Sequence, residues 1–211
     1  MDTVVRRLLR AAGSETFAEQ AGIPLKDQPA ALFKLLVLAN LLSARISADI
    51  GVAAARELFA AGGGTARGLA RLDWRTLVDA LDRARYVRYD ESTATRLGDM
   101  AEQVQETYNG DLRRLPVEAG RDLERASALL RRFPGIGPVG VDVFCREAQA
   151  MWPWLRPYVD AQALKGAERL GLPADPKRLA DEVPDRDLAR FTAALVRVAR
   201  DKRLAEAVAR G

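Results

Sequence analysis

The chain has 211 residues, and its 33 Lys plus Arg exceed its 29 Asp plus Glu, which gives a formal net charge of +4. This length suits one domain or two interlocked lobes, and the modest basic excess permits a face toward nucleic acid, although such an excess is usually just a solvated surface. No apolar run approaches the roughly 20 residues of a membrane span, and the N-terminus lacks a signal-peptide core, so we expect a cytoplasmic protein.

Cysteine and histidine content excludes several kinds of site. Cys145 is the only cysteine, and there is no histidine. A disulfide within one chain cannot form, and a cysteine-ligated zinc or iron–sulfur site lacks ligands. Because Cys145 lies beside Phe144 in an apolar stretch, we expect a buried structural thiol.

The first half of the chain reads as a series of helices. The sequence is rich in Ala, Leu and Arg and poor in aromatic and β-branched runs, which predicts an all-α protein. Apolar spacing predicts a helix near Thr3–Ala12, and Gly22-Ile23-Pro24 then breaks the chain. Pro29 can open the next helix, whose residues Leu32–Leu42 are apolar nearly all round, as in a central helix packed on every side.

Capping residues mark the helices that follow. Ser47 can cap a helix that ends at Gly62-Gly63-Gly64, which we expect to be a flexible surface loop because no strand or Gly-Lys-Ser/Thr of a phosphate loop adjoins it. Asp73 caps the next helix. A long helix is expected from Ser92 to Tyr108, ended by Asn109-Gly110.

The most informative stretch is Phe133-Pro134-Gly135-Ile136-Gly137, between predicted helices at Val117–Arg132 and Pro138–Met151. Pro134 and Gly135 stop the first helix, and Pro138 suits the first position of the second. The expected element is helix, tight hairpin, helix. Its second helix aims free N–H groups and a positive dipole end outward, which suits an anion such as phosphate; a plain turn is the alternative.

Three further helices are expected after the hairpin. Asp160 opens one, Asp175-Pro176 opens a short one, and Asp185 opens a last amphipathic helix. The first of these aspartates stands in the sequence Tyr158-Val159-Asp160, followed by Lys165 and Arg169.

These stretches resemble the helix-hairpin-helix (HhH-GPD) DNA glycosylase superfamily typified by endonuclease III. The resemblance rests on the Phe-Pro-Gly-Ile-Gly hairpin, on Val159-Asp160 after it, and on Leu41-Leu42-Ser43-Ala44 at the end of the early buried helix. It implies a two-lobed all-α fold, with a six-helix lobe at residues 30–151 and a second lobe from residues 1–29 and 152–211. Since this chain lacks the family's cluster cysteines, we expect no iron–sulfur cluster.

The resemblance implies that Asp160 is the catalytic aspartate. Cleaving an N-glycosidic bond develops positive charge on the sugar, which a fixed carboxylate stabilises. An ordinary N-cap is the alternative for Asp160, and the two roles are compatible. Bifunctional members carry a nucleophilic lysine where Val139 stands here, so no lyase step is expected. Asp142 is either a second carboxylate of the site or a surface charge.

DNA contacts are also implied by the resemblance. We expect the hairpin backbone to bind phosphate through Gly135, Gly137, Val139 and Gly140. Arg45 stands where relatives have a gap-filling glutamine, and it could fill the space left by a flipped base, contact phosphate or form a structural ion pair. Lys165 could contact phosphate.

Backbone carbonyls of such hairpins commonly hold a monovalent cation. By position, the carbonyls of Arg131, Phe133 and Ile136 would hold K⁺ or Na⁺. No other cofactor is expected.

The sequence therefore predicts a monofunctional DNA glycosylase that flips and excises a damaged or mismatched base from double-stranded DNA. The expected protein is a monomer that associates with the nucleoid and not with a membrane. A catalytically silent helix-hairpin-helix protein that binds DNA structures is the alternative.

Overall fold

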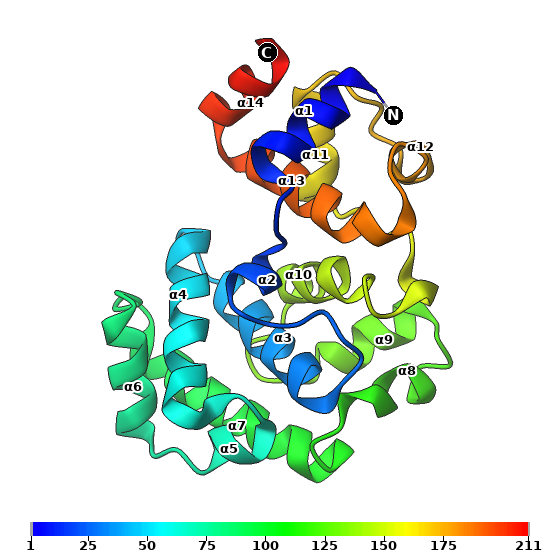
Figure 1. The fold of residues 1–211 in the computed structure, drawn as a ribbon. Coiled ribbons are helices and arrows are strands. Elements are labelled where there is room, and N and C mark those ends of the chain that lie inside the picture. Colours follow the sequence, from blue (N-terminus) through cyan, green and yellow to red (C-terminus); the bar gives the residue numbers. More distant parts are fainter. Residues whose placement is uncertain (1, 211) are drawn as a thin grey trace. The chain divides into compact units, whose positions relative to one another are not determined.

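The computed structural model describes residues 2–210. Within this range it contains helices and no strands, so the expected all-α class is confirmed. None of the helices in this range is long and apolar enough to cross a membrane. Two compact units make up the chain (Figure 1). Unit 1 is Met1–Phe17 with Cys145–Gly211, and unit 2 is Ala18–Phe144. The boundaries expected from the sequence are 29/30 and 151/152.

The α-helices are α1 (Thr3–Ala12), α2 (Phe17–Gln20), α3 (Pro29–Leu42), α4 (Ala48–Leu58), α5 (Ala66–Ala70), α6 (Trp74–Arg83), α7 (Asp90–Tyr108), α8 (Leu115–Glu118), α9 (Leu123–Leu130), α10 (Pro138–Ala148), α11 (Ala161–Arg169), α12 (Pro176–Ala180), α13 (Leu188–Arg200) and α14 (Lys202–Arg210). A π-helical turn (Phe59–Gly63) and 3₁₀ turns at Leu112–Arg114, Pro153–Leu155 and Asp185–Asp187 lie between them.

Helix α3 forms the core of unit 2, as expected. Pro29 is its first residue, where a missing N–H costs nothing. Ten apolar side chains between Ala31 and Leu42 are buried, and α4 and α7 pack against the helix. Asn40 is the only polar residue among the buried side chains of α3. Its contacts matter for the hairpin.

The predicted helix caps are confirmed. Ser47 accepts a hydrogen bond from the N–H of Ile50 at 3.3 Å, and Asp73 accepts one from Thr76 at 2.8 Å. Asn109 ends α7 with a left-handed φ of 51°.

The triple glycine differs from the expected surface loop. Gly62 adopts a φ of 102° inside the π-helical turn, and Gly63 is buried. A side chain at Gly63 would place its Cβ 2.9 Å from the carbonyl oxygen of Leu58, so close packing requires glycine there.

The helix expected at Val117–Arg132 is wrong in one respect, because it is two helices. α8 ends at Glu118 and α9 begins at Leu123. Gly120 and Arg121 between them adopt left-handed φ angles of 62° and 57°, which an α-helix does not allow. Asp122 then caps α9 by accepting a hydrogen bond from Arg125 N–H at 2.8 Å.

Unit 1 contains both ends of the chain and is organised by the pair α11 and α13. Gly166 makes their close approach possible, since a Cβ there would clash with the backbone of Leu195. α1 packs on α13, and both contact α14, a helix that was not predicted from the sequence. The helix openings expected at Asp160 and Asp175 are confirmed.

Candidate functional site

The hairpin of unit 2 joins α9 to α10 through a tight turn. α9 ends at Leu130, and the N–H of Ile136 donates to the carbonyl of Phe133 at 3.1 Å. Gly135 adopts a φ of +80°, which a residue with a side chain rarely takes. Pro138 is the first residue of α10, as expected.

The side chain of Asn40 on α3 supports this turn, a role that was not predicted from the sequence. Its Nδ2 donates to the carbonyl of Pro134 at 2.9 Å, and the residue is 4% exposed. A Cβ on Gly135 would clash with the Asn40 amide, so glycine is also required there for space. A lone asparagine in an otherwise apolar buried helix was the available signal, because buried polar groups need partners.

The N-terminus of α10 is open. A Cβ at Gly137 would meet nothing within 4 Å, and Val139 is 50% exposed. Among residues 2–210, the N–H groups of Gly137, Val139 and Gly140 have no hydrogen-bond partner. Gly140 itself is buried, and a Cβ there would lie 2.9 Å from Oγ of Ser43. The turn thus offers unpaired amides at a helix start, the arrangement that binds anions.

Arg45 lies in the loop between α3 and α4 and is exposed. No acidic partner of Arg45 is present in residues 2–210, so the ion-pair alternative for this residue has no support. Its guanidinium is available for an external partner.

Asp160 in unit 1 is the N-cap of α11, as predicted. Its Oδ1 accepts hydrogen bonds from the N–H groups of Gln162 at 2.8 Å and Ala163 at 3.1 Å. Its Oδ2 forms an ion pair with Arg146, which sequence reasoning did not identify. The two side chains are 1% and 4% exposed, respectively. Both carboxylate oxygens are therefore occupied within the chain.

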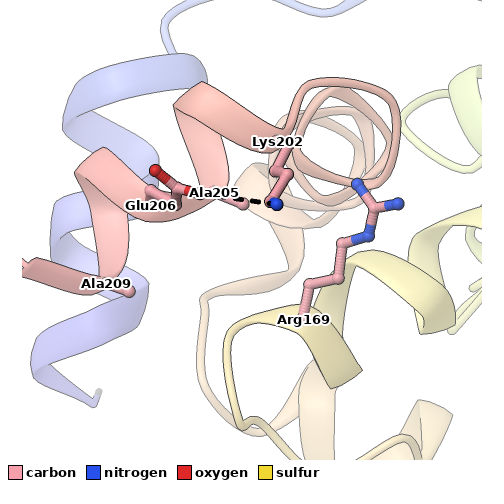
Figure 2. A pocket seen from close by; sticks show the side chains of 5 residues that line it. All are labelled: Arg169, Lys202, Ala205, Glu206 and Ala209. Atoms are coloured by element: carbon pink, nitrogen blue, oxygen red, sulfur yellow. Dashed lines mark ion pairs between the residues drawn. The ribbon is translucent and has the colours of Figure 1, made fainter.

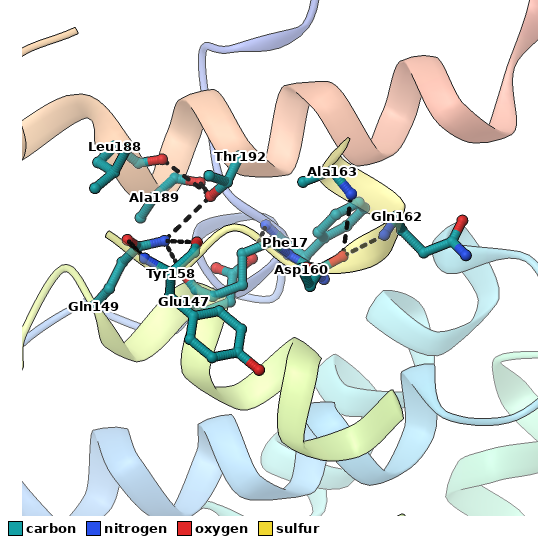
Figure 3. A network of polar contacts seen from close by, with 11 residues as sticks. Phe17, Glu147, Gln149, Tyr158, Asp160, Gln162, Ala163, Leu188, Ala189 and Thr192 are labelled. Atoms are coloured by element: carbon teal, nitrogen blue, oxygen red, sulfur yellow. Dashed lines mark hydrogen bonds and ion pairs between the residues drawn. The ribbon is translucent and has the colours of Figure 1, made fainter. Parts of the chain in front are cut away.

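The segment that leads to Asp160 is fixed by Gln149 (Figure 3). The Gln149 Nε2 donates to the carbonyl of Tyr158 at 3.0 Å, and its Oε1 accepts from the N–H of Tyr158 at 3.0 Å. The same Nε2 lies 2.9 Å from the carbonyl of Arg146 and 3.3 Å from Oγ1 of Thr192. Gln149 thus connects α10, α13 and the segment before α11.

Two more basic side chains of unit 1 are those of Arg200 and Lys165. Arg200 is exposed at the end of α13; partial burial and then the charge of Arg146 lower the pKa of Arg200, whereas Asp160 acts in the opposite direction. Lys165 is exposed on α11, where no acidic partner is present in the described chain. Asp142 on α10 is half-buried, and Cys145 is buried, as expected for a structural thiol.

Two cavities lie away from these residues. One of about 320 Å³ in unit 1 is lined by Arg169, Lys202, Ala205, Glu206 and Ala209 (Figure 2). One of about 600 Å³ in unit 2 adjoins Tyr108, Arg113 and Val117. Neither is lined by Asp160, Arg45 or the hairpin glycines.

No group of three or more His, Cys, Asp or Glu within 2–210 could hold a metal ion. At the hairpin, the carbonyls of Arg131 and Ile136 accept no hydrogen bond within the described chain, whereas that of Phe133 accepts from Ile136 N–H. Free backbone carbonyls are the donors that a monovalent cation would use.

Comparison with known proteins identifies the fold. No protein-family model matches the chain, and no curated protein matches its sequence. Among solved structures, the chain is similar to a trapped covalent intermediate of endonuclease III with DNA, an estranged-adenine complex. The TM-score is 0.50 with 17% sequence identity, over 86% of this chain and 81% of that chain. The protein therefore has an endonuclease III-like helix-hairpin-helix fold, and the resemblance expected from the motifs is confirmed at the level of the fold.

Proposed function

We propose that the protein is a monofunctional DNA glycosylase, which excises a damaged or mismatched base from double-stranded DNA without cutting the strand. The open start of α10, with unpaired amides at Gly137, Val139 and Gly140, is the observation that supports it best. A helix start of this kind attracts a phosphate through its N–H groups and dipole. The neighbour of known structure is a DNA complex, which is in keeping with this proposal.

Charge supports a nucleic-acid partner in unit 1. Unit 2 has 17 basic and 17 acidic residues, whereas unit 1 has 16 basic and 12 acidic ones. The whole excess of +4 thus belongs to unit 1. Helices α1, α13 and α14, which pack on one another, have nine basic residues and one acidic residue, Glu206. We expect these helices and Lys165 to attract the phosphate backbone over a longer range, while the hairpin makes close contact.

The proposed chemistry is hydrolysis at the flipped nucleotide. The base leaves the helical stack, and Arg45 takes its space or contacts phosphate. As the bond between sugar and base breaks, the base leaves with the bonding electron pair, and the carboxylate of Asp160 stabilises the positive charge on the sugar. Water then adds to the anomeric carbon, and the proton that it loses neutralises the departing base. Val139 has no amine, so no Schiff base with the opened sugar forms at that position.

A monovalent cation would complete the hairpin. The carbonyls of Arg131, Phe133 and Ile136 would hold it, and its charge would add to the attraction for phosphate. No cluster of iron and sulfur is proposed for this chain, because it has only one cysteine.

A second candidate is a catalytically silent protein that binds DNA structures. The buried pair of Asp160 with Arg146 favours this candidate, because a carboxylate whose two oxygens are occupied is not free to face a sugar. Both candidates require the same hairpin.

The experiment that separates them is excision on a panel of duplexes. Oligonucleotides with uracil, hypoxanthine, oxidised, alkylated or mismatched bases are incubated with the protein and treated with alkali, which cleaves at abasic sites. A glycosylase yields alkali-dependent products on at least one duplex and no borohydride-trapped adduct. Binding without products on the whole panel would favour the silent binder. Binding that does not weaken with salt would contradict both, because each neutralised phosphate should contribute about −0.9 to the log–log slope.

A further inference from the structure

The carboxylate of Asp160 is neutralised inside the chain. Its Oδ1 caps α11, and its Oδ2 is paired with the guanidinium of Arg146, with 1% of the Asp160 side chain exposed. A carboxylate stabilises a cationic sugar by its negative charge, and a cation in contact with it opposes this effect. Paired with Arg146 in this way, Asp160 would stabilise the sugar cation poorly.

Arg146 is not placed as a stabilising ion pair would require. Its Nε is buried with no hydrogen-bond partner in residues 2–210, and its guanidinium lies over the face of Phe17, 5.7 Å from the ring centroid. Arg197 lies over the same ring at 4.4 Å. Buried charges with unmet donors lower stability, and buried pairs often contribute less to it than apolar residues would. A stabilising role does not account for Arg146.

The Asp160 side of the pair is held by several hydrogen bonds. Gln149 binds both backbone groups of Tyr158 at 3.0 Å, and Asp160 Oδ1 holds the first turn of α11 (Figure 3). If the pair opens, Arg146 has to move. Arg200 is exposed at the end of α13 and interacts electrostatically with both Arg146 and Asp160. Two positive charges thus face one negative charge, so an arriving phosphate would offer the arginines an alternative anion.

We propose that Arg146 is a positioning residue that holds Asp160 in a neutralised state, so that excision is limited by the opening of the Arg146–Asp160 pair when DNA binds. This inference rests on the proposed glycosylase function, and it adds a control to the same carboxylate. It predicts that the charge of Arg146 suppresses the interaction of Asp160 with a cationic sugar.

The test compares Arg146→Gln, which keeps a hydrogen-bond donor without charge, with Arg146→Lys, which keeps the charge. Two duplexes serve as probes, one with a cationic pyrrolidine analogue of the abasic sugar and one with the neutral tetrahydrofuran analogue. The measured quantity is the ratio of the two dissociation constants at pH 8. Because both constants come from the same preparation, unfolded protein cancels from the ratio.

We expect the preference for the cationic duplex, measured by the ratio of dissociation constants, to be about tenfold greater in Arg146→Gln than in wild type, because one opposing charge is removed. In Arg146→Lys the ratio should stay within about twofold of the wild-type value. Excision of the lesion found in the panel should rise in Arg146→Gln by a similar factor. An unchanged or reduced ratio in Arg146→Gln, with DNA binding intact, would overturn the inference and leave Arg146 as a structural residue or as an orienting one.

Failure of the proposed function gives a different result. If wild type binds the probes but excises nothing, and the ratio still rises in Arg146→Gln, the glycosylase proposal fails and the control of Asp160 by Arg146 stands. If neither protein binds duplex DNA, both fall. Melting of Arg146→Gln, Asp160→Asn and the double variant gives a further check, because a real pair makes the two losses in melting temperature non-additive.

Discussion

Two consecutive helices, α10 and α11, begin in different ways. At α10 the turn of Pro134 and Gly135 leads into a start whose amides at Gly137 and Val139 have no partner in the described chain. At α11 the carboxylate of Asp160 accepts two of the first N–H groups and is itself paired with Arg146. Every helix start attracts negative charge. At α11 the chain itself supplies the anion, which is the carboxylate of Asp160. The start of α10 is free to bind an external anion.

The two helix starts differ in whether they are ready to bind or to act on a substrate. An open helix start at an exposed turn can take a phosphate without rearrangement, so α10 is ready to bind. The start of α11 already holds the carboxylate of Asp160. This carboxylate can act on a substrate only after its ion pair with Arg146 has opened.

The largest effect is expected at the closed start, for Asp160→Asn. The amide can still cap α11, but it leaves the buried charge of Arg146 without a partner, which costs roughly 3–5 kcal/mol of stability. If the carboxylate acts on the sugar, single-turnover excision should also fall by on the order of 10²-fold or more. Thermal melting and excision of the lesion found in the panel measure the two effects.

Asp175→Asn is the matched control for this substitution. Asp175 caps α12 by accepting from Arg178 N–H at 2.8 Å, and it is exposed. The free energy of unfolding of Asp175→Asn should lie within about 0.5 kcal/mol of the wild-type value. Equal stability losses in both variants would show that the cap, and not the pair with Arg146, determines the effect.

A smaller loss is expected under the open start, for Asn40→Ala. This substitution removes the 2.9 Å hydrogen bond to the carbonyl of Pro134 and leaves a gap beneath Gly135, so stability should fall by about 1–3 kcal/mol. Binding to duplex DNA should weaken with it, because the turn loses its support. Ser43→Ala is the control, since the Ser43 hydroxyl donates only to the carbonyl of Ala39 one turn back, at 2.6 Å. If DNA binding weakens in Ser43→Ala and not in Asn40→Ala, Asn40 is not the residue that supports the turn.

Much of this contrast could be read from the sequence. The hairpin, the start of α10 at Pro138 and the cap at Asp160 follow from local signals, because proline, glycine and aspartate restrict the few residues around them. The break between α8 and α9 was also readable, since Gly120 and Asp122 are a stop and a cap.

What the sequence could not provide are the partners that tertiary packing brings together. Arg146 precedes Asp160 by 14 residues, and no local spacing connects them. From the cap alone, Asp160→Asn would be expected to change stability little, and the ion pair reverses that expectation. Asn40 and Pro134 are separated by 94 residues, and only the apolar surroundings of Asn40 indicated that it needed a partner.

An effect on binding alone is expected from Gly137→Asp. The site has open space for a side chain, so the variant should fold, but a carboxylate would lie where phosphate is expected to bind. Duplex affinity should fall by about tenfold, with a shallower salt dependence because one phosphate contact is lost. Gly98→Asp on α7 is the control, because its surroundings are also open and it adds the same charge to unit 2. Equal losses in both variants would mean that the charge, and not the hairpin, decides binding.

The smallest effect is expected for Tyr108→Phe, beside the hairpin. The Tyr108 ring lies 6.1 Å from that of Phe133, and its hydroxyl donates to Glu118 at 2.9 Å. Near pH 7 the loss of this hydrogen bond should cost about 1 kcal/mol or less. Burial and then the bond to the Glu118 carboxylate raise the pKa of Tyr108 above its ordinary value of 10.0.

The raised pKa gives this prediction a pH dependence. Because the folded protein holds the phenol proton more tightly than the unfolded chain does, the stabilisation is complete below about pH 10 and is lost as the pH rises toward the folded pKa. The melting temperature of wild type should therefore fall more steeply above pH 10 than that of Tyr108→Phe. Glu118→Gln keeps an acceptor and removes the charge, so its melting temperature should fall less steeply than that of wild type. Parallel curves for the three proteins would mean that alkaline unfolding begins away from the packing between Tyr108 and the hairpin.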